Sequence, residues 1–151
     1  MTKPLEKSRI KTKQSAFWHG VWHITWPPIM VLLLHVGLAA IIGHRVEFDP
    51  LFHLLGGMAG ALTLGRTADA FSQFHALFSV RNRSLTTIGG MIAAIFVWEL
   101  GEFLSDRFFG THTQSGFQDT GLDVLLGLLG TVGIVVIANL LTTREARKNV
   151  A

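Results

Sequence analysis

The sequence predicts an all-α, polytopic membrane protein: a four-transmembrane-helix bundle with an N-terminal interfacial amphipathic segment. Of its 151 residues, 49% are apolar and only 15% are charged, below the roughly 25% charged residues of soluble domains. The mean hydropathy is positive, at +0.43. Basic residues gather at the ends of apolar runs, where membrane topology places them. A soluble domain of this size would need more polar surface.

Residues 1–27 form a basic, tryptophan-rich leader, which we expect at the cytoplasmic face and the membrane interface. Its tryptophans recur every four residues, at Trp18, Trp22 and Trp26. Residues four apart share one face of a helix, and indole rings favour the headgroup level. We therefore interpret the three as an interfacial anchor. Pro27 and Pro28 then reorient the chain, because proline is tolerated in the first turn of a following helix.

Four apolar runs of helical length follow and define a transmembrane domain over residues 28–141. We expect the helices over about residues 28–43, 49–71, 84–104 and 119–141. The first run is short, and it crosses if its flanks lie at the two interfaces. The sequence GTHTQSG between the third and fourth runs predicts a turn. Residues 142–151 form a polar cytoplasmic tail.

The distribution of charge predicts the orientation. With the N-terminus inside, the inner segments hold eleven basic residues, whereas the outer loops hold only Arg45 and Arg107. This bias follows the positive-inside rule. We therefore expect a multi-pass protein of the bacterial cytoplasmic (inner) membrane with the N-terminus and the C-terminus in the cytoplasm. Since topology explains the basic residues, we expect no nucleic-acid partner.

Acidic residues gather instead at the predicted outer ends of the helices, together with one histidine. The candidate polar or metal-binding cluster is His53, Glu99, Glu102, Asp119, Asp123 and Asp49. Helical phase places these residues on faces that we expect to meet. Carboxylate oxygens with one imidazole suit Mg²⁺, Mn²⁺ or Zn²⁺. A proton relay and an acid–base pair of a hydrolytic site are alternatives. Helix capping is the simpler explanation for Asp49 and Asp119.

Small residues lie beneath this cluster on two of the predicted helices. The candidate helix-packing residues are Gly56, Gly57, Gly60, Gly127 and Gly130. Glycine permits helix backbones to approach closely in membranes, as in the GxxxG spacing of Gly56 and Gly60. We therefore expect these helices to pack against one another.

His35 lies in the middle of the first predicted span. A buried histidine can ligate haem or the magnesium of a chlorophyll, although a hydrogen bond to a neighbouring helix is the simpler interpretation.

The chain has no cysteine, which excludes disulfides and thiolate sites. It contains no GxSxG, HExxH, phosphate-loop or dinucleotide motif, so we assign no catalytic residue and leave enzymatic activity undecided, with a preference against it.

Three sequence runs carry a family resemblance. They are His53-Leu-Leu-Gly-Gly57 with Arg66, Glu99-Leu-Gly-Glu102-Phe103, and Gln118-Asp119-Thr-Gly-Leu-Asp123-Val. Over residues 45–138 the chain resembles the YjdF-like family of small bacterial inner-membrane proteins, and more distantly the VanZ-like proteins. It departs from the VanZ pattern at Gly127, which replaces an asparagine. The resemblance implies that the histidine, the paired glutamates and the paired aspartates of the YjdF-like pattern correspond to His53, Glu99, Glu102, Asp119 and Asp123. It implies no defined reaction. Many YjdF-like members have more helices than the four expected here.

Three functions are compatible with this pattern. We favour a non-catalytic subunit, a packing or assembly partner of a larger membrane complex. The alternative is a membrane-embedded metal-binding protein, or a hydrolase acting on a lipid or envelope substrate through the outer cluster. An oligomeric transporter or proton pathway is the second alternative. The expected partners are the lipid bilayer and other membrane subunits or further copies of this chain. The expected cofactor is a divalent metal, with pigment or haem as a minor alternative.

Overall fold

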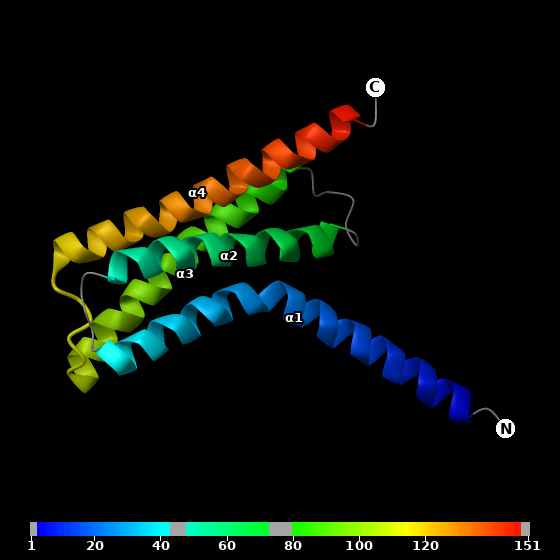
Figure 1. Ribbon diagram of the computed structural model, residues 1–151, viewed down its shortest axis with the longest axis horizontal. Helices are drawn as coiled ribbons and strands as arrows, with labels where there is room; N and C mark the ends of the chain where they lie inside the picture. The colour runs from blue at the N-terminus through cyan, green and yellow to red at the C-terminus, as the bar shows by residue number, and fades with distance from the viewer. Residues whose placement is uncertain (1–2, 43–47, 73–79, 149–151) are drawn as a thin grey trace.

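The computed structural model describes residues 3–42, 48–72 and 80–148 of the chain. Four helices make up nearly all of this part: α1 (Lys3–Ile42), α2 (Asp49–Ser72), α3 (Val80–Phe109) and α4 (Phe117–Lys148). They run in alternating directions, so that the start of α1 and the end of α4 point to the same end of the molecule (Figure 1). The all-α prediction is confirmed, and no strand occurs in the described ranges.

Within the described residues, two helices are long and apolar enough to cross a membrane, Arg83–Phe109 in α3 and Phe117–Lys148 in α4. Their outward faces expose large apolar side chains, including Phe96, Val97 and Leu125. The segment Trp22–Leu38 of α1 is a shorter apolar helix. A large exposed apolar surface of this kind is typical of contact with lipid. The structure therefore supports a membrane protein with two clear candidate spans.

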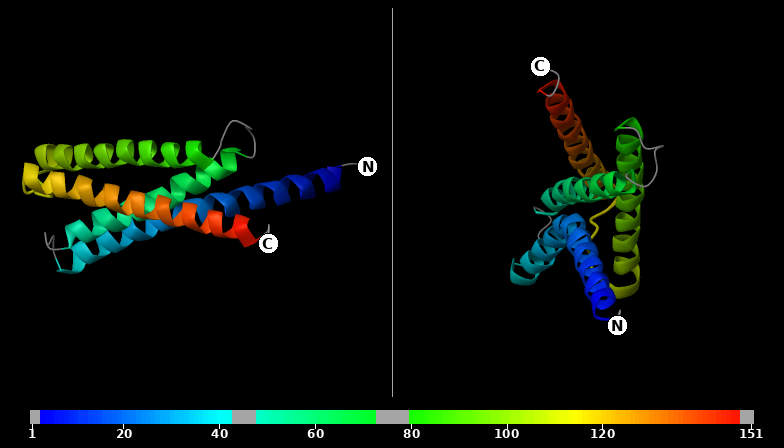
Figure 2. Two further views of the ribbon diagram at one scale, coloured as in Figure 1. Left: turned by 90° about the horizontal axis from the view of Figure 1, so that it is seen from above. Right: turned by 90° about the vertical axis from the view of Figure 1, so that its right-hand side faces the viewer.

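Helix α2 occupies the centre of the molecule. It packs against α1, α3 and α4, and Figure 2 shows α1 and α3 on opposite sides of it. A helix enclosed by three others exposes little surface to lipid, so it does not need a continuous apolar sequence. This explains why α2 is glycine-rich, carries Asp49, His53 and Arg66, and is absent from the apolar candidates.

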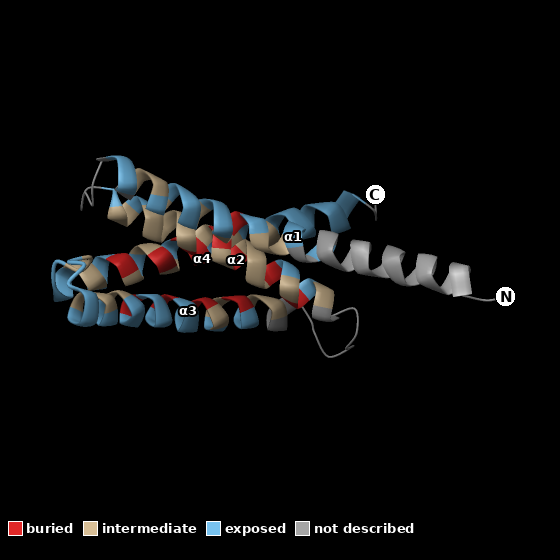
Figure 3. Cartoon of the chain, turned by 90° about the horizontal axis from the view of Figure 1, so that it is seen from below, coloured by how far each residue is buried: buried red, intermediate tan, exposed pale blue. Residues whose placement is uncertain are grey.

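The closest helix contact joins α2 to α4. A Cβ atom added to Gly57 would overlap the backbone of Gly127, and one added to Gly130 would overlap the carbonyl of Leu54. The Thr131 hydroxyl, which is fully buried, donates to the Gly127 carbonyl at 2.8 Å. Buried residues lie on the inner sides of α2, α3 and α4 (Figure 3). Only glycine permits the two backbones to come this close.

Gly60 also lies at a helix contact, because an added Cβ would meet Met91 Sδ of α3 at 2.6 Å. Gly127 faces Ile95 of α3 in the same way, with its Cδ1 atom at 3.0 Å from an added Cβ. Gly56 differs from the prediction, because an added Cβ there meets nothing within 4 Å. The contact pair on α2 is therefore Gly57 with Gly60, and Gly56 points into open space.

Helix α1 is continuous through Pro27 and Pro28, which differs from the predicted boundary at these residues. The leader and the first span thus form one helix of 40 residues, which bends along its length (Figure 1) as proline-containing helices do. Trp22 and Trp26 are exposed, in agreement with a lipid-facing position. The side chain of Trp18 lies outside the described residues.

The two prolines leave two carbonyl groups of α1 without their usual partners. Proline has no N–H group, so the carbonyls four residues earlier, at His23 and Ile24, lose their helical donors. Helix α2 replaces both donors: Thr63 Oγ1 donates to the Ile24 carbonyl at 2.8 Å, and Arg66 Nη1 donates to the His23 carbonyl at 2.8 Å. The bend in α1 is therefore its attachment point to α2.

The other helices also extend past their predicted ends. Helix α4 continues to Lys148 instead of ending at 141, because Glu, Ala, Arg and Lys are good helix formers and basic residues are favourable in a last turn. Helix α3 begins at Val80 and ends at Phe109. Most of the connection expected over residues 72–83, and the loop that contains Arg45, lie outside the described residues.

The α2–α4 contact generates the first prediction. Gly57→Ala should destabilise the protein by about 1–3 kcal/mol, because the added methyl group forces two backbones apart. Gly56→Ala, the adjacent residue on the same helix, should be neutral. Thermal unfolding of the purified protein in detergent measures both. Equal effects of the two substitutions would show that the helices do not meet as described.

The attachment of α1 generates a second prediction. Thr63→Val should cost about 1 kcal/mol, because the Ile24 carbonyl then lacks a donor. In a Pro28→Ala background the same substitution should cost close to nothing, because an alanine at this position supplies the missing N–H within the helix. A double-mutant cycle of unfolding free energies measures this coupling. Additive effects would contradict the assignment.

Candidate metal site

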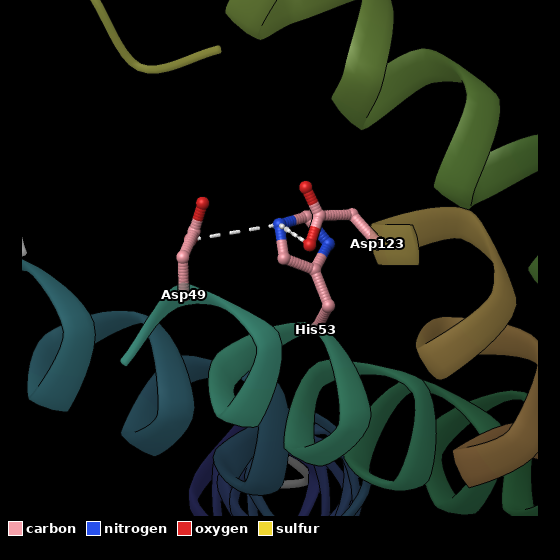
Figure 4. Close-up of side chains that lie close together, drawn as sticks. All are labelled: Asp49, His53 and Asp123. Atoms are coloured by element: carbon pink, nitrogen blue, oxygen red, sulfur yellow. Dashed lines mark ion pairs between the residues drawn. The ribbon is translucent and has the colours of Figure 1, made fainter. Parts of the chain in front are cut away.

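Three helices bring one histidine and four carboxylates together. Asp49 lies in the first turn of α2, and His53 follows one turn later on the same face. His53 Nε2 lies 3.6 Å from Asp49 Oδ1 and 3.8 Å from Asp123 Oδ1 of α4 (Figure 4). His53 Nδ1 lies 3.5 Å from Glu99 Oε1 of α3. The imidazole therefore has carboxylates at both of its nitrogen atoms.

Two of these carboxylates are almost completely buried. Asp123 is 1% exposed and Glu99 is 5% exposed. Within the described part of the chain, Asp123 Oδ1 and Glu99 Oε1 have no hydrogen-bond partner, and neither does Glu102 Oε2. Buried carboxylate oxygens are normally hydrogen-bonded, because an unsatisfied one loses the energy of its hydration. These oxygen atoms all belong to one cluster.

The distances from the two ring nitrogens of His53 to the carboxylate oxygens suit a metal ion at either nitrogen. They exceed the usual 2.7–3.2 Å of an N–H···O hydrogen bond. Two donors that each lie about 2.1 Å from a tetrahedral ion are about 3.4 Å apart. The measured separations from His53, between 3.5 and 3.8 Å, are close to this value.

The cluster contains two overlapping sets of three donors. The first is Asp49, His53 and Asp123, and the second is His53, Glu99 and Glu102. In each set the donor atoms lie within 4.8 Å of one another. His53 belongs to both, since its Nε2 atom faces the first set and its Nδ1 atom faces Glu99.

The turn between α3 and α4 positions Glu99. Asp106 Oδ1 accepts hydrogen bonds from Thr111 Oγ1 at 2.6 Å and from Thr113 N at 2.7 Å, and Asp106 Oδ2 accepts one from Gln114 N at 2.8 Å. This arrangement folds the turn back over α3. Gln114 Nε2 then donates to the backbone carbonyl of Glu99 at 3.0 Å and to its Oε2 atom at 3.3 Å.

Gln114 is the site residue that the sequence analysis missed. Its segment predicted only a turn, and nothing in its spacing pointed toward Glu99. The sequence feature that could have indicated an ordered turn is Asp106 followed by a threonine-rich segment, since an aspartate side chain commonly accepts hydrogen bonds from nearby backbone N–H groups. Glu102 has a local partner, because Trp98 Nε1 donates to its Oε1 atom at 2.9 Å.

Asp119 lies apart from the donor sets. Asp119 lies in the first turn of α4, and its Oδ2 atom accepts a hydrogen bond at 2.9 Å from the N–H of Ser115, which precedes the helix, similar to the bond that reaches back in a capping box. His35 faces the cluster: its ring stacks on Phe52 with centroids 4.6 Å apart, and its Nε2 atom lies 3.9 Å from Asp49 Oδ1.

An apolar cavity of about 360 Å³ adjoins the cluster, and we call it the lateral cavity. All four helices line it. Its polar lining residues are His35, His53 and Glu99, and Gly56 and Gly60 form part of the wall on α2. A cavity with apolar walls and a few convergent polar groups is the usual form of a ligand site.

The anchored turn generates a third prediction. Asp106→Ala should release the turn, because four hydrogen-bond donors lose their acceptor, and the amides of Thr113 and Gln114 should exchange with solvent at least about tenfold faster. Hydrogen exchange followed by mass spectrometry measures this. Arg107→Ala, at the adjacent exposed position, is the control. Unchanged exchange in the Asp106 variant would contradict the assignment.

Searches of curated proteins and of solved structures gave no match to the chain. A family model described as "Predicted membrane protein (DUF2238)" matches residues 15–144. The match includes the whole polar cluster and the transmembrane domain expected from the sequence. YjdF-like proteins form part of this family, so the resemblance is confirmed. The chain belongs to the DUF2238 family of predicted membrane proteins.

Proposed function

We propose that this protein binds a divalent metal ion within the membrane, between α2, α3 and α4. The observation that supports this most directly is Asp123 Oδ1, a buried and unpartnered oxygen atom beside His53 Nε2, in the donor set that these two residues form with Asp49. Mixed carboxylate and imidazole donors suit Mn²⁺ and Zn²⁺.

The balance of charge supports a cation at this place. Four carboxyl groups surround one imidazole ring, and among the described residues the ion pairs of Glu99 and Asp123 are with His53 alone. Buried carboxylates without compensation are strongly unfavourable. A divalent ion supplies two positive charges and satisfies several oxygen atoms at once, which no single hydrogen bond does.

The proposed membrane arrangement has four crossing helices. Helices α3 and α4 are long and apolar enough to cross, α1 contributes Trp22–Leu38, and α2 crosses at the centre. The acidic cluster lies near one end, and Arg66 and the Arg83–Asp69 ion pair lie near the other. By the positive-inside rule the arginine end is cytoplasmic, which places both termini there and the metal site toward the outer face.

The candidate helix-packing glycines give no separate support to a role as a subunit. In the structure Gly57, Gly127 and Gly130 pack against other parts of the same chain, so they offer no surface to a second protein. A role as a subunit stays a prediction, and the metal site has the more specific support. Metal-assisted hydrolysis and transport also stay predictions.

The test is the effect of metal on stability. The protein is purified in detergent with a chelator and then titrated with Mn²⁺ or Zn²⁺ during thermal unfolding. At a metal concentration one hundred times the dissociation constant, we expect stabilisation by about 2.7 kcal/mol. Asp123→Asn should remove most of this gain, because it removes one anionic oxygen donor from the site.

Asp119→Asn is the matched control, with the same substitution one turn away on the same helix, and it should keep the metal response. In chelator, Asp123→Asn should be at least as stable as the unsubstituted protein, because one uncompensated buried carboxylate is gone. The proposal fails if neither metal stabilises the protein, or if both variants lose the response equally.

A further inference from the structure

The lateral cavity opens toward lipid between α1 and α3. Its opposite walls come from these two helices, with Ile29 and Leu32 on α1 and Ala94 and Ile95 on α3. Across the described residues α1 packs against α2 alone, whereas α3 packs against α2 and α4. No helix contact therefore closes the cavity on the side between α1 and α3, and Figure 2 shows the two helices apart.

The cavity has a polar end and an apolar end along the helix axis. His53 and Glu99 mark the polar end beside the metal site, and Gly60 and Met91 mark the apolar end. His53 and Gly60 are seven residues apart on α2, which corresponds to about 10 Å along the helix. The polar end lies toward the membrane surface and the apolar end toward the bilayer centre. A lipid of the adjacent leaflet has the same orientation.

We infer that the lateral cavity binds a hydrocarbon chain of a phosphate-bearing membrane lipid, which enters between α1 and α3. The phosphate then lies at the polar end and contributes an oxygen ligand to the metal ion. This inference rests on the proposed function for the phosphate contact, because the carboxylates alone would repel an anion. The chain contact depends only on the shape and lining of the cavity.

The apolar lining favours a lipid over a water-soluble ligand, and the volume and the donor sets are compatible with one. The walls are apolar apart from the histidines and Glu99, so a polar molecule would lose its hydration without replacement. The volume of about 360 Å³ falls in the range of sites that enclose small ligands. Each donor set has three protein ligands, and three-ligand metal sites commonly leave one position for an external oxygen.

The test uses photochemical crosslinking in lipid nanodiscs. The full chain is reconstituted with Mn²⁺ and a trace of phosphatidic acid that carries a diazirine on one acyl chain. A diacylglycerol with the same labelled chain lacks only the phosphate. We expect phosphatidic acid adducts on Ile29, Leu32 or Ala94, and chelation should reduce their yield to the level of diacylglycerol.

Two glycine variants distinguish the cavity from the general lipid surface. Gly56→Leu places a side chain in the cavity without a backbone clash, since an added Cβ there meets nothing within 4 Å. It should reduce the cavity adducts at least about fivefold, because the leucine fills the space that the chain needs. Gly133→Leu is the matched control. Gly133 is exposed on α4, and an added Cβ there also meets nothing within 4 Å, so this substitution should leave the yield of cavity adducts unchanged. Ala94→Phe blocks the cavity from α3 if the Gly56 variant does not fold.

The outcomes separate this inference from the proposed function. Adducts that spread over the outer faces of α3 and α4, and that persist in Gly56→Leu and Ala94→Phe, overturn the inference even if the metal stabilises the protein. Cavity adducts that are lost in Gly56→Leu but do not respond to chelation overturn the phosphate–metal contact. If metal does not stabilise the protein and the cavity adducts form without it, the proposed function and the phosphate–metal contact are both overturned.

Discussion

The close approach of α2 to α4 determines where the polar groups of this protein meet. Gly57 and Gly127 are in contact, and His53 and Asp123 each lie four residues earlier on the same two helices. The helices run in the same direction (Figure 1), so residues one turn before the contact face each other. The absence of a Cβ atom at Gly57 therefore allows the imidazole to lie beside a buried carboxylate. A side chain at Gly57 would separate these groups.

This contact also explains the unusual composition of α2. The helix is enclosed by its three neighbours, so glycines and polar residues face protein instead of lipid. The same enclosure buries Glu99 and Asp123, and one oxygen atom of each has no hydrogen-bond partner among the described residues. Polar groups in such a position are expensive and commonly functional. The tight packing of the helices and the burial of these two carboxylates thus have one structural cause.

The sequence predicted the helical class and most of the cluster, because helical phase depends only on spacing. Phase also placed Asp119 and Asp123 on one face of the helix, yet only Asp123 lies close to His53. Asp119 instead accepts a hydrogen bond from the N–H of Ser115, just before α4. Local capping competes with tertiary contacts, and spacing does not decide between them. Gln114 escaped prediction because a turn determines its direction. The boundary at Pro28 was wrong because another helix supplies the donors that proline lacks.

The bend in α1 links the proline pair to the cavity. Thr63 and Arg66 hold α1 at the carbonyls that Pro27 and Pro28 leave free, and Pro28 itself lines the cavity. From this point α1 continues along α2 to His35, whose ring stacks on Phe52 beside Asp49. One wall of the cavity is therefore fixed to α2 at both ends. An ordinary helix without prolines would offer α2 no free carbonyls to bind, so the same sequence feature that bends α1 also holds it against the cavity.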